Sequence, residues 1–368
     1  MNILAIETSC DETAMALVSA QCKVQSEKEE IIPDFEILAE VVSSQIDIHR
    51  PYGGVVPSLA KREHLKNLPV VYEQILQKWE RENRGLDIDR IAVTVGPGLE
   101  PALWTGINYA KELSVKLGVP LAGVNHLEGH IYSNWLQPAG KMSMTNDQCP
   151  TFPAIVLIVS GGHTVLLCME SIKKWEKLGE TQDDAVGEAF DKVAKMLGLP
   201  YPGGPEVERC AAQISEIRNQ KFDIRNPIFP RPMLHSGNYN FSFSGLKTAV
   251  LYYVRNMNSA TAYVVNRETS GMHIQNICAS FQQAAIDVLV TKTIRAAEKY
   301  GAQSILLCGG VAANNALQAE FRFRIHDSGM SFFVPELKYN TDNAVMIAAA
   351  AYLGNHYPTE IAQGNLGL

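Results

Sequence analysis

Apolar runs and polar turns alternate along the first eighty residues. Residues 2–6 are apolar, the polar sequence ETSCDET covers residues 7–13, and residues 14–19 are apolar again, which predicts a strand, a tight turn and a second strand. The polar stretch 21–36 predicts an elongated hairpin tip or loop. Apolar residues between 59 and 79 recur at helical spacing, which predicts a long amphipathic helix.

The pattern then changes to strands that are followed by helices. Residues 91–95 form a β-branched strand that breaks at the sequence GPG, and a helix is expected from near Pro101. Residues 121–124 predict a short strand, and residues 126–136 predict another helix. The next residues, 137–151, are polar and contain glycine and two prolines, as expected of a linker.

The second half of the chain opens as the first half does. Residues 154–159 predict a buried strand, the sequence SGGH at 160–163 a turn, and residues 164–169 a second strand. This repeated order of strand, small polar turn and strand is a weak internal repeat. Residues 185–197 then predict a helix with one apolar face.

The remaining pattern completes an α/β assignment. Residues 200–245 are rich in proline, glycine and asparagine and predict an irregular region. Residues 241–247, which overlap its end, fit a half-buried strand better than a base-contacting loop. Residues 274–300 predict a long amphipathic helix, and residues 304–307 a strand that leads into a glycine turn and another helix. Because helices follow strands, we expect right-handed crossovers and a mainly parallel component beside the hairpins.

Composition and charge narrow the class of protein. A chain of 368 residues has room for two or three domains of about 150 residues each, and 46% apolar with 19% charged residues excludes a disordered or fibrous chain. The net charge is −7, so binding to RNA requires a local basic patch on this chain or a basic patch on a partner protein. The candidate residues for such a patch are Lys61, Arg62, Arg225, Arg231 and Lys247.

Cysteine usage and the N-terminal sequence indicate the compartment. The seven cysteines are scattered and form no C-x-x-C pair, which favours a reducing environment over a disulfide framework. The first residues, MNILAIETSC, lack the features of a signal peptide, and no run of 18 apolar residues occurs. We therefore expect a cytoplasmic protein that makes no contact with a membrane.

His126 and His130 are the strongest chemical signal in the chain. Two histidines at i and i+4 lie on one helical face, at about the separation that one metal ion requires, and nitrogen ligands suit zinc, iron, nickel or copper better than magnesium. The sequence HLEGH is not the zincin motif, in which glutamate directly follows the first histidine. On spacing alone, a metal site and two hydrogen-bonded histidines at a helix start are equally good interpretations.

Glycine turns and polar side chains follow several of the predicted strands. Three glycine turns can together surround one nucleotide, whereas each alone is ordinary turn chemistry. They are Ser160-Gly161-Gly162, Gly203-Gly204 and Gly309-Gly310. Asp342 is either a ligand or the N-cap of the helix that follows it. Neither a P-loop nor a G-x-G-x-x-G after the first strand is present.

Several long segments, in order along the chain, resemble one protein family. They are AIETSCDET, NHLEGH, VSGGHT, GEAFDKVAKMLGLPYPGGP, FSFSGLKTAV, CGGVAAN and TDNAVMIA. Together they resemble the tRNA N6-adenosine threonylcarbamoyltransferase family (TsaD in bacteria), earlier described as O-sialoglycoprotein endopeptidases. The resemblance runs from about residue 2 to residue 350.

The resemblance implies an α/β fold of the actin, hexokinase and heat-shock ATPase (ASKHA) type, with two related lobes around a central cleft. We expect the first lobe at residues 1–136, with helices from about 345–368 packing back onto it. The linker is expected at 137–151, and the second lobe at 152–344 with an irregular and helical insert at about 172–250.

The resemblance also implies site residues. His126, His130 and Asp342 correspond to ligands of one divalent transition metal ion, usually assigned as Fe²⁺, with Zn²⁺ also compatible. Asp11 and Glu12 are candidate catalytic residues by their place alone. The implied substrate-binding positions are Ile158, Val159, Ser160, Gly161, Gly162, Asp191, Gly204, Glu208 and Asn314.

The implied reaction transfers a threonylcarbamoyl group from threonylcarbamoyl-adenylate to N6 of the adenosine at position 37 of ANN-reading tRNAs, with release of AMP. Bacterial relatives work with a paralogous TsaB-type subunit and a TsaE-type ATPase, which we expect as partners. The alternatives are a metal-dependent endopeptidase and a small-molecule kinase on the same fold. The first predicts a glutamate in zincin geometry, and the second does not explain the two histidines.

Overall fold

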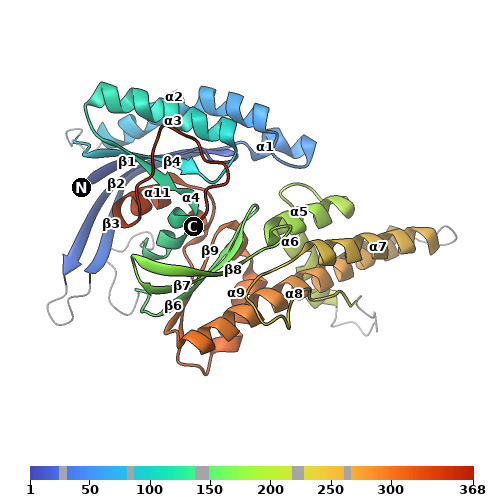
Figure 1. Ribbon diagram of the computed structural model, residues 1–368. Helices are drawn as coiled ribbons and strands as arrows, with labels where there is room; N and C mark the ends of the chain where they lie inside the picture. The colour runs from blue at the N-terminus through green and yellow to red at the C-terminus, as the bar shows by residue number, and fades with distance from the viewer. Residues whose placement is uncertain (25–30, 81–86, 137–148, 218–227, 261–266) are drawn as a thin grey trace. The chain divides into compact units, whose positions relative to one another are not determined.

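In the computed structural model the chain divides into two compact units, each built on its own five-stranded sheet (Figure 1). Unit 1 comprises Met1–Thr151 and Phe333–Leu368, and unit 2 comprises Phe152–Phe332. The described residues are all those outside 25–30, 81–86, 137–148, 218–227 and 261–266. Most of the linker expected at 137–151 therefore falls outside them.

The sheet of unit 1 has the strand order β3-β2-β1-β4-β5. Strands β1, β2 and β3 pair antiparallel, whereas β1, β4 and β5 run parallel. The bounds are β1 Asn2–Glu7, β2 Glu12–Val24, β3 Ile31–Ser44, β4 Arg90–Gly96 and β5 Leu121–Asn125. The hairpin expected around residues 21–36 is present, and its two strands extend well into that polar stretch.

Helices cover both faces of this sheet. Helices α2 and α3 pack on one face, and α11 packs on the other face and against α4 (Figure 1). Apolar residues at helical spacing, among them Leu68, Val71 and Ile75, form the buried side of α2. The bounds are α1 Ile46–His49, η1 Arg50–Tyr52, α2 Pro57–Glu80, α3 Glu100–Leu117, α4 His126–Tyr132, η2 Ser133–Trp135, α10 Leu337–Asn340 and α11 Ala344–Leu353.

The sheet of unit 2 repeats the arrangement of unit 1. Its order is β10-β9-β6-β7-β8, in which β6, β7 and β8 pair antiparallel and β9 runs parallel to β6. The bounds are β6 Ala154–Val159, β7 Thr164–Ser171, β8 Lys174–Glu180, β9 Ser304–Cys308 and β10 Ser331–Phe333. In each unit the first strand therefore has its hairpin on one side and a parallel strand on the other. This confirms the α/β class and the internal repeat.

The helices of unit 2 pack around the long helix α8, which contacts β6, α6, α7 and α9. The bounds are α5 Val186–Met196, α6 Gly203–Ile217, α7 Ser244–Ala260, α8 Arg267–Tyr300, η4 Gly310–Ala313 and α9 Asn315–Ile325. Across the part of the chain that the structure describes, no helix is both long enough and apolar enough to cross a membrane.

The expectation that residues 200–245 are irregular is wrong for their first part, because α6 begins at Gly203. Glycine and Pro205 suggested a turn, but they occupy the first helical turn, where proline needs no amide hydrogen bond. The amide of Gly203 donates to Asp191 Oδ1 at 2.7 Å, which supports the helix start. Buried Val207 and Cys210 then have helical spacing.

The half-buried strand expected at residues 241–247 is also wrong. Phe241 makes one isolated bridge with Thr181, and α7 already begins at Ser244. The side chains of Phe241 and Phe243 are fully buried. The two aromatic residues of the alternating pattern are therefore core residues. The small residues mark a helix start, where the Ser244 amide donates to the carboxylate of Asp183.

Lys292 of α8 holds the irregular segment before α7 in place. Its side chain is fully buried, and its Nζ donates to Ser236 Oγ at 2.8 Å and to the carbonyl oxygens of Asn238 and Asn240. A buried ammonium group is tolerated when its donors are matched by acceptors in this way.

We expect Lys292→Met to lower the free energy of unfolding by about 1–3 kcal/mol, because it leaves buried carbonyl oxygens unpaired. Urea denaturation followed by circular dichroism measures this loss. The matched control is Lys299→Met on the same helix, whose exposed side chain lies over two tyrosine rings. An equal loss in both variants would contradict the role given to Lys292.

Candidate metal centre and substrate-binding residues

The carboxyl ends of β1, β4 and β5 bring polar residues from distant segments together in unit 1. These strands are parallel neighbours, so Glu7 at the end of β1, Thr94 on β4 and His126 after β5 share one edge of the sheet. Ligand sites of parallel sheets form at this edge. His126 opens α4, and the side chain of Asn125 caps that helix by accepting from the Leu127 amide at 2.8 Å.

Asp342, just before α11, completes a cluster with two histidines. Its Oδ1 lies 3.4 Å from Nε2 of His126 and 3.4 Å from Nε2 of His130. The N-cap of α11 is Asn343, whose side chain accepts from the Met346 amide at 2.9 Å. The alternative in which Asp342 caps this helix is therefore wrong, and its carboxylate faces the histidines.

The donor atoms of this cluster fit one metal ion. Nitrogen and oxygen atoms of His126, His130 and Asp342 lie within 4.8 Å of one another, and donors about 2.1 Å from a shared ion are themselves about 3–3.5 Å apart. Both ring nitrogens of His130 are buried without a hydrogen-bond partner among the described residues. Buried nitrogens are normally paired, so an ion at Nε2 accounts for one of them. The geometry favours a metal site over two merely hydrogen-bonded histidines.

The charges around the cluster favour a cation. Burial lowers the pKa of His126, but the carboxylates of Asp342 and Glu7 outweigh it and raise that pKa well above its usual value. Burial raises the pKa of Asp342, and His126 more than reverses this, so the pKa is lowered overall. Burial holds the pKa of His130 below its usual value. His130 is therefore a neutral imidazole, and Asp342 is ionised.

Gly129 allows α11 to lie close to α4. A β-carbon at this position would lie 3.1 Å from side-chain atoms of Met346 and of Ile347. Such a contact is tighter than most real β-carbon contacts, so glycine permits the approach that brings Asp342 to the histidines.

Glu128 lies between the two histidines in sequence but does not face them. Its buried carboxylate accepts from the Asn355 amide at 3.0 Å and from the Tyr357 hydroxyl. A metallopeptidase needs a glutamate that serves the metal-bound water. Because Glu128 is engaged with the C-terminal segment, the endopeptidase alternative loses the residue it requires.

Glu7 was not among the residues predicted for the site. It is fully buried and lies 3.1 Å from Nδ1 of His126. The signal that could have identified it is an acidic residue directly at the end of the first apolar run. Charged residues are rarely fully buried in such a strand unless they have a partner.

Asp11 and Glu12 lie in unit 1 where β1 turns into β2. Asp11 is buried, and Glu12 is partly buried with its Oε1 accepting from Ser44 Oγ at 3.2 Å. Burial and then the charge of Asp11 raise the pKa of Glu12 well above its usual value. A carboxylate with a raised pKa is a stronger base than an exposed one. A role for either residue in catalysis stays a prediction.

In unit 2, β6 ends in a turn of small residues that borders open space. Ile158 and Val159 are fully buried in β6, and Ser160 begins the turn. A β-carbon added at Gly161 or Gly162 would meet no atom within 4 Å. The two glycines are exposed, so their backbone amides are accessible to a ligand.

Contacts among α5, α6 and α9 link the other expected substrate positions of unit 2. Asp191 of α5 accepts from the amide of Gly203 at the start of α6, and Glu208 of α6 accepts from the amide of Asn315 at 2.7 Å. Asn314 caps α9 by accepting from the Leu317 amide. Asp191, Glu208 and Asn314 make these contacts themselves, and Gly204 is the next residue after Gly203. Their contact with a substrate stays a prediction.

Two of the basic residues expected to contact RNA are neutralised by acids. Arg231 lies 2.8 Å from Asp287, and Lys247 lies 2.5 Å from Asp184. These pairs weaken the case for both residues as phosphate contacts. The other candidates are Lys61 and Arg62, exposed on α2, and Arg225, which lies outside the described residues.

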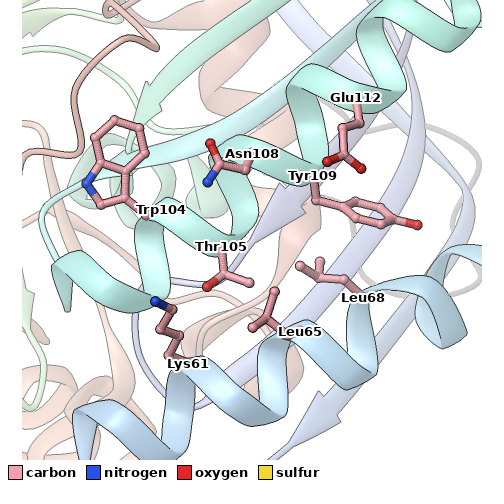
Figure 2. Close-up of a pocket in the computed structure, with 8 residues that line it drawn as sticks. All are labelled: Lys61, Leu65, Leu68, Trp104, Thr105, Asn108, Tyr109 and Glu112. Atoms are coloured by element: carbon pink, nitrogen blue, oxygen red, sulfur yellow. The ribbon is translucent and has the colours of Figure 1, made fainter.

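A pocket of about 190 Å³ lies between α2 and α3 in unit 1 (Figure 2). Leu65 and Leu68 of α2 and Trp104 and Tyr109 of α3 form its apolar lining. No residue predicted for the metal or substrate site lines it, although the RNA-contact candidate Lys61 does, and its volume is below the usual range of about 300–1,000 Å³ for ligand pockets. It also lies on the sheet face opposite α11, away from Asp342.

The chain is an α/β protein with an ASKHA-type fold and a candidate metal-binding cluster. The structure resembles HypF from T. kodakarensis, with a TM-score of 0.54 and 14% identity over 95% of this chain and 47% of that chain. It also resembles full-length HypF in its phosphate- and nucleotide-bound form, with a TM-score of 0.53 and 12% identity over 95% of this chain and 54% of that one. The chain spans about half the length of these proteins, and the likeness shows the fold.

Within that class, the model of the family described as tRNA N6-adenosine threonylcarbamoyltransferase matches residues 36–349. The enzyme of this name from Thermosipho africanus is 45% identical over 354 residues, covering 96% of this chain and 94% of the relative. The enzyme of the same name from Bacillus subtilis is 45% identical over 352 residues, which cover 95% of this chain and 89% of the relative. The chain belongs to the tRNA N6-adenosine threonylcarbamoyltransferase family, and it is a metal-dependent acyltransferase that modifies adenosine in tRNA.

We expect Asp342→Asn to weaken metal binding strongly while the fold stays intact, because the amide has nearly the same shape but lacks the charge. Asn343→Ala is the matched variant: it removes the cap of α11 and costs about 1 kcal/mol of stability, with a smaller effect on the metal. Elemental analysis and thermal unfolding of both proteins measure the two effects. Full metal content in Asp342→Asn would remove this residue from the ligand set.

Proposed function

We propose that the chain transfers the threonylcarbamoyl group of threonylcarbamoyl-adenylate to N6 of the adenosine at position 37 in tRNAs that read ANN codons. The observation that carries the proposal is the cluster of His126, His130 and Asp342 in a chain that matches the family over residues 36–349. A subunit that served only in assembly would not need two buried histidines and a partly buried aspartate with their donor atoms within 4.8 Å of one another.

His126, His130 and Asp342 hold Fe²⁺ in this proposal, and Zn²⁺ suits the same two imidazoles and one carboxylate. When bound there, the ion would supply positive charge that offsets negative charge developing on oxygen atoms of the donor. The chain's own contribution is to bring the three donors together: α4 carries both histidines, and the Asn343 cap fixes the start of α11 beside Asp342.

The turn after β6 receives the AMP end of the donor. Gly161 and Gly162 border open space, so a phosphate or ribose can approach their backbone amides. Ser160 lies in the same turn, and Ile158 and Val159 fix it from β6. The remaining residues proposed to contact the nucleotide are Asp191, Gly204, Glu208 and Asn314. Asp191 and Asn314 already support the starts of α6 and α9, so they act on the nucleotide partly through those helix starts.

The chemical step needs a proton acceptor. The N6 amine attacks the carbonyl carbon of the donor, the bond from that carbon to the phosphate oxygen breaks, and AMP leaves. The amine proton passes to Asp11 or Glu12, of which Glu12 has the raised pKa. Because an adenylate is already activated, positioning of the two reactants supplies much of the rate.

RNA binding is shared with partner proteins in this proposal. The net charge is −7, and two of the candidate basic residues are paired with aspartates. A TsaB-type paralogue and a TsaE-type ATPase supply the missing basic surface, and the complex works in the cytoplasm. Binding of tRNA by the complex then depends more steeply on salt than binding by this chain alone.

The function is tested by incubating the purified chain with threonylcarbamoyl-adenylate and tRNA, with and without the two partners, and analysing the nucleosides. We expect threonylcarbamoyladenosine at position 37 and an equal amount of AMP. Chelation abolishes the product, and Fe²⁺ restores it better than Zn²⁺. Product that persists after complete metal removal, or cleavage of a glycoprotein without tRNA modification, would overturn the proposal.

We expect Gly161→Val to weaken AMP binding at least about tenfold, which corresponds to about 1.4 kcal/mol, and to leave the unfolding transition unchanged. The matched control is Gly237→Val, because Gly237 is also an exposed glycine of unit 2 at which an added β-carbon would meet no atom within 4 Å. Calorimetry with AMP measures both. Equal affinities in the two variants would remove the β6 turn from the nucleotide site.

A further inference from the structure

The buried carboxylate of Glu7 points to a second layer of the metal centre. Glu7 has no exposed surface, and its Oε2 lies 3.1 Å from Nδ1 of His126, while Nε2 of the same ring faces Asp342. The imidazole of His126 is thus held between two carboxylates, one at each nitrogen. We propose that Glu7 is a positioning residue, which fixes His126 through Nδ1–H so that Nε2 is presented to the metal ion.

The strand order explains why Glu7 can reach His126. β4 lies between β1 and β5, and Glu7 ends β1 while His126 directly follows β5. Thr94 on β4 bridges this gap, because its hydroxyl donates to Glu7 Oε2 at 2.5 Å. The Ser9 amide donates to the other oxygen, Oε1. With both oxygens engaged, the carboxylate has one orientation, and it is the one that meets the ring.

The chemistry of the ring selects between two acceptors. When Nε2 binds a metal ion, Nδ1 carries the proton and must donate it. The available acceptors are Glu7 Oε2 at 3.1 Å and Ser9 Oγ at 3.2 Å. A hydrogen bond to an ionised acceptor is roughly twice as strong as one to a neutral oxygen. Glu7 is therefore the acceptor, and the arrangement is a carboxylate–histidine–metal triad.

Among the described residues that contact Glu7, His126 is the one that can carry positive charge. A carboxylate without exposed surface is costly unless such a partner is present. If Glu7 served only in packing, an uncharged residue of similar size at the end of β1 would serve equally well. The charge at this position is accounted for by the ring that it holds.

The inference rests on the metal site proposed above, and its test separates the two. Zn²⁺ affinity is measured by competition with a chromophoric chelator, and the absorption spectrum of the Co²⁺-loaded protein reports the ligand field. We expect Glu7→Gln to lower Zn²⁺ affinity about 10–100-fold, the usual effect of losing such a partner, and to shift the Co²⁺ bands. Ser9→Ala loses less affinity than Glu7→Gln.

Glu128→Gln is the matched control, since Glu128 is an equally buried glutamate on α4 that contacts Asn355 and Tyr357 rather than a ligand. It keeps Zn²⁺ affinity and the Co²⁺ spectrum close to those of the unaltered protein. Unchanged Zn²⁺ affinity in Glu7→Gln, or equal losses in the two glutamine variants, overturns the positioning role.

Two further variants keep the outcome decisive. If Glu7→Gln does not fold, Thr94→Val removes the hydrogen bond that orients the carboxylate, and it must lower Zn²⁺ affinity in the same direction; no loss there also overturns the role of Glu7. His126→Ala tests the ligand set itself. If His126→Ala keeps full Zn²⁺ affinity, the metal site is wrong, whereas loss in His126→Ala without loss in Glu7→Gln refutes only the positioning role.

Discussion

The contact of Asp342 with the two histidines is the interaction on which the candidate metal centre depends. Oδ1 of Asp342 lies at the same distance from Nε2 of His126 and Nε2 of His130. The start of α11 must therefore be placed correctly against α4. Gly129 permits the close approach of α11 to α4, and Asn343 takes over the capping of α11. If Asp342 had to cap the helix itself, its carboxylate would be turned toward backbone amides and lost to the ion.

The two units share one strand arrangement but differ in the turn that comes after their first strand. After β1 the turn carries acids, including buried Asp11, whereas after β6 it carries the exposed glycines Gly161 and Gly162. Acids suit a cation and a proton, and bare amides suit a phosphate. The duplication therefore gives two equivalent positions, which carry acidic side chains in unit 1 and exposed glycines in unit 2.

Regular elements of this chain were predictable where periodicity and burial agree. The strands with both faces buried, such as β4 and β6, appear as apolar runs, and α2 shows helical spacing. The start of α6 was missed because Gly203 and Pro205 resemble turn residues, and the deciding contact comes from Asp191 on another helix. Spacing also gave both histidines of the cluster but left their role open, because Asp342 reaches them only through tertiary packing.

Unit 1 is interrupted in sequence by the whole of unit 2, because it resumes at Phe333 after ending at Thr151. During translation, His126 and His130 are therefore synthesised long before Asp342. The nascent chain carries both histidines without Asp342 while all of unit 2 is being synthesised. Asp342 is consequently the last of the three candidate ligands to be synthesised, and a chain cut short within unit 2 lacks it.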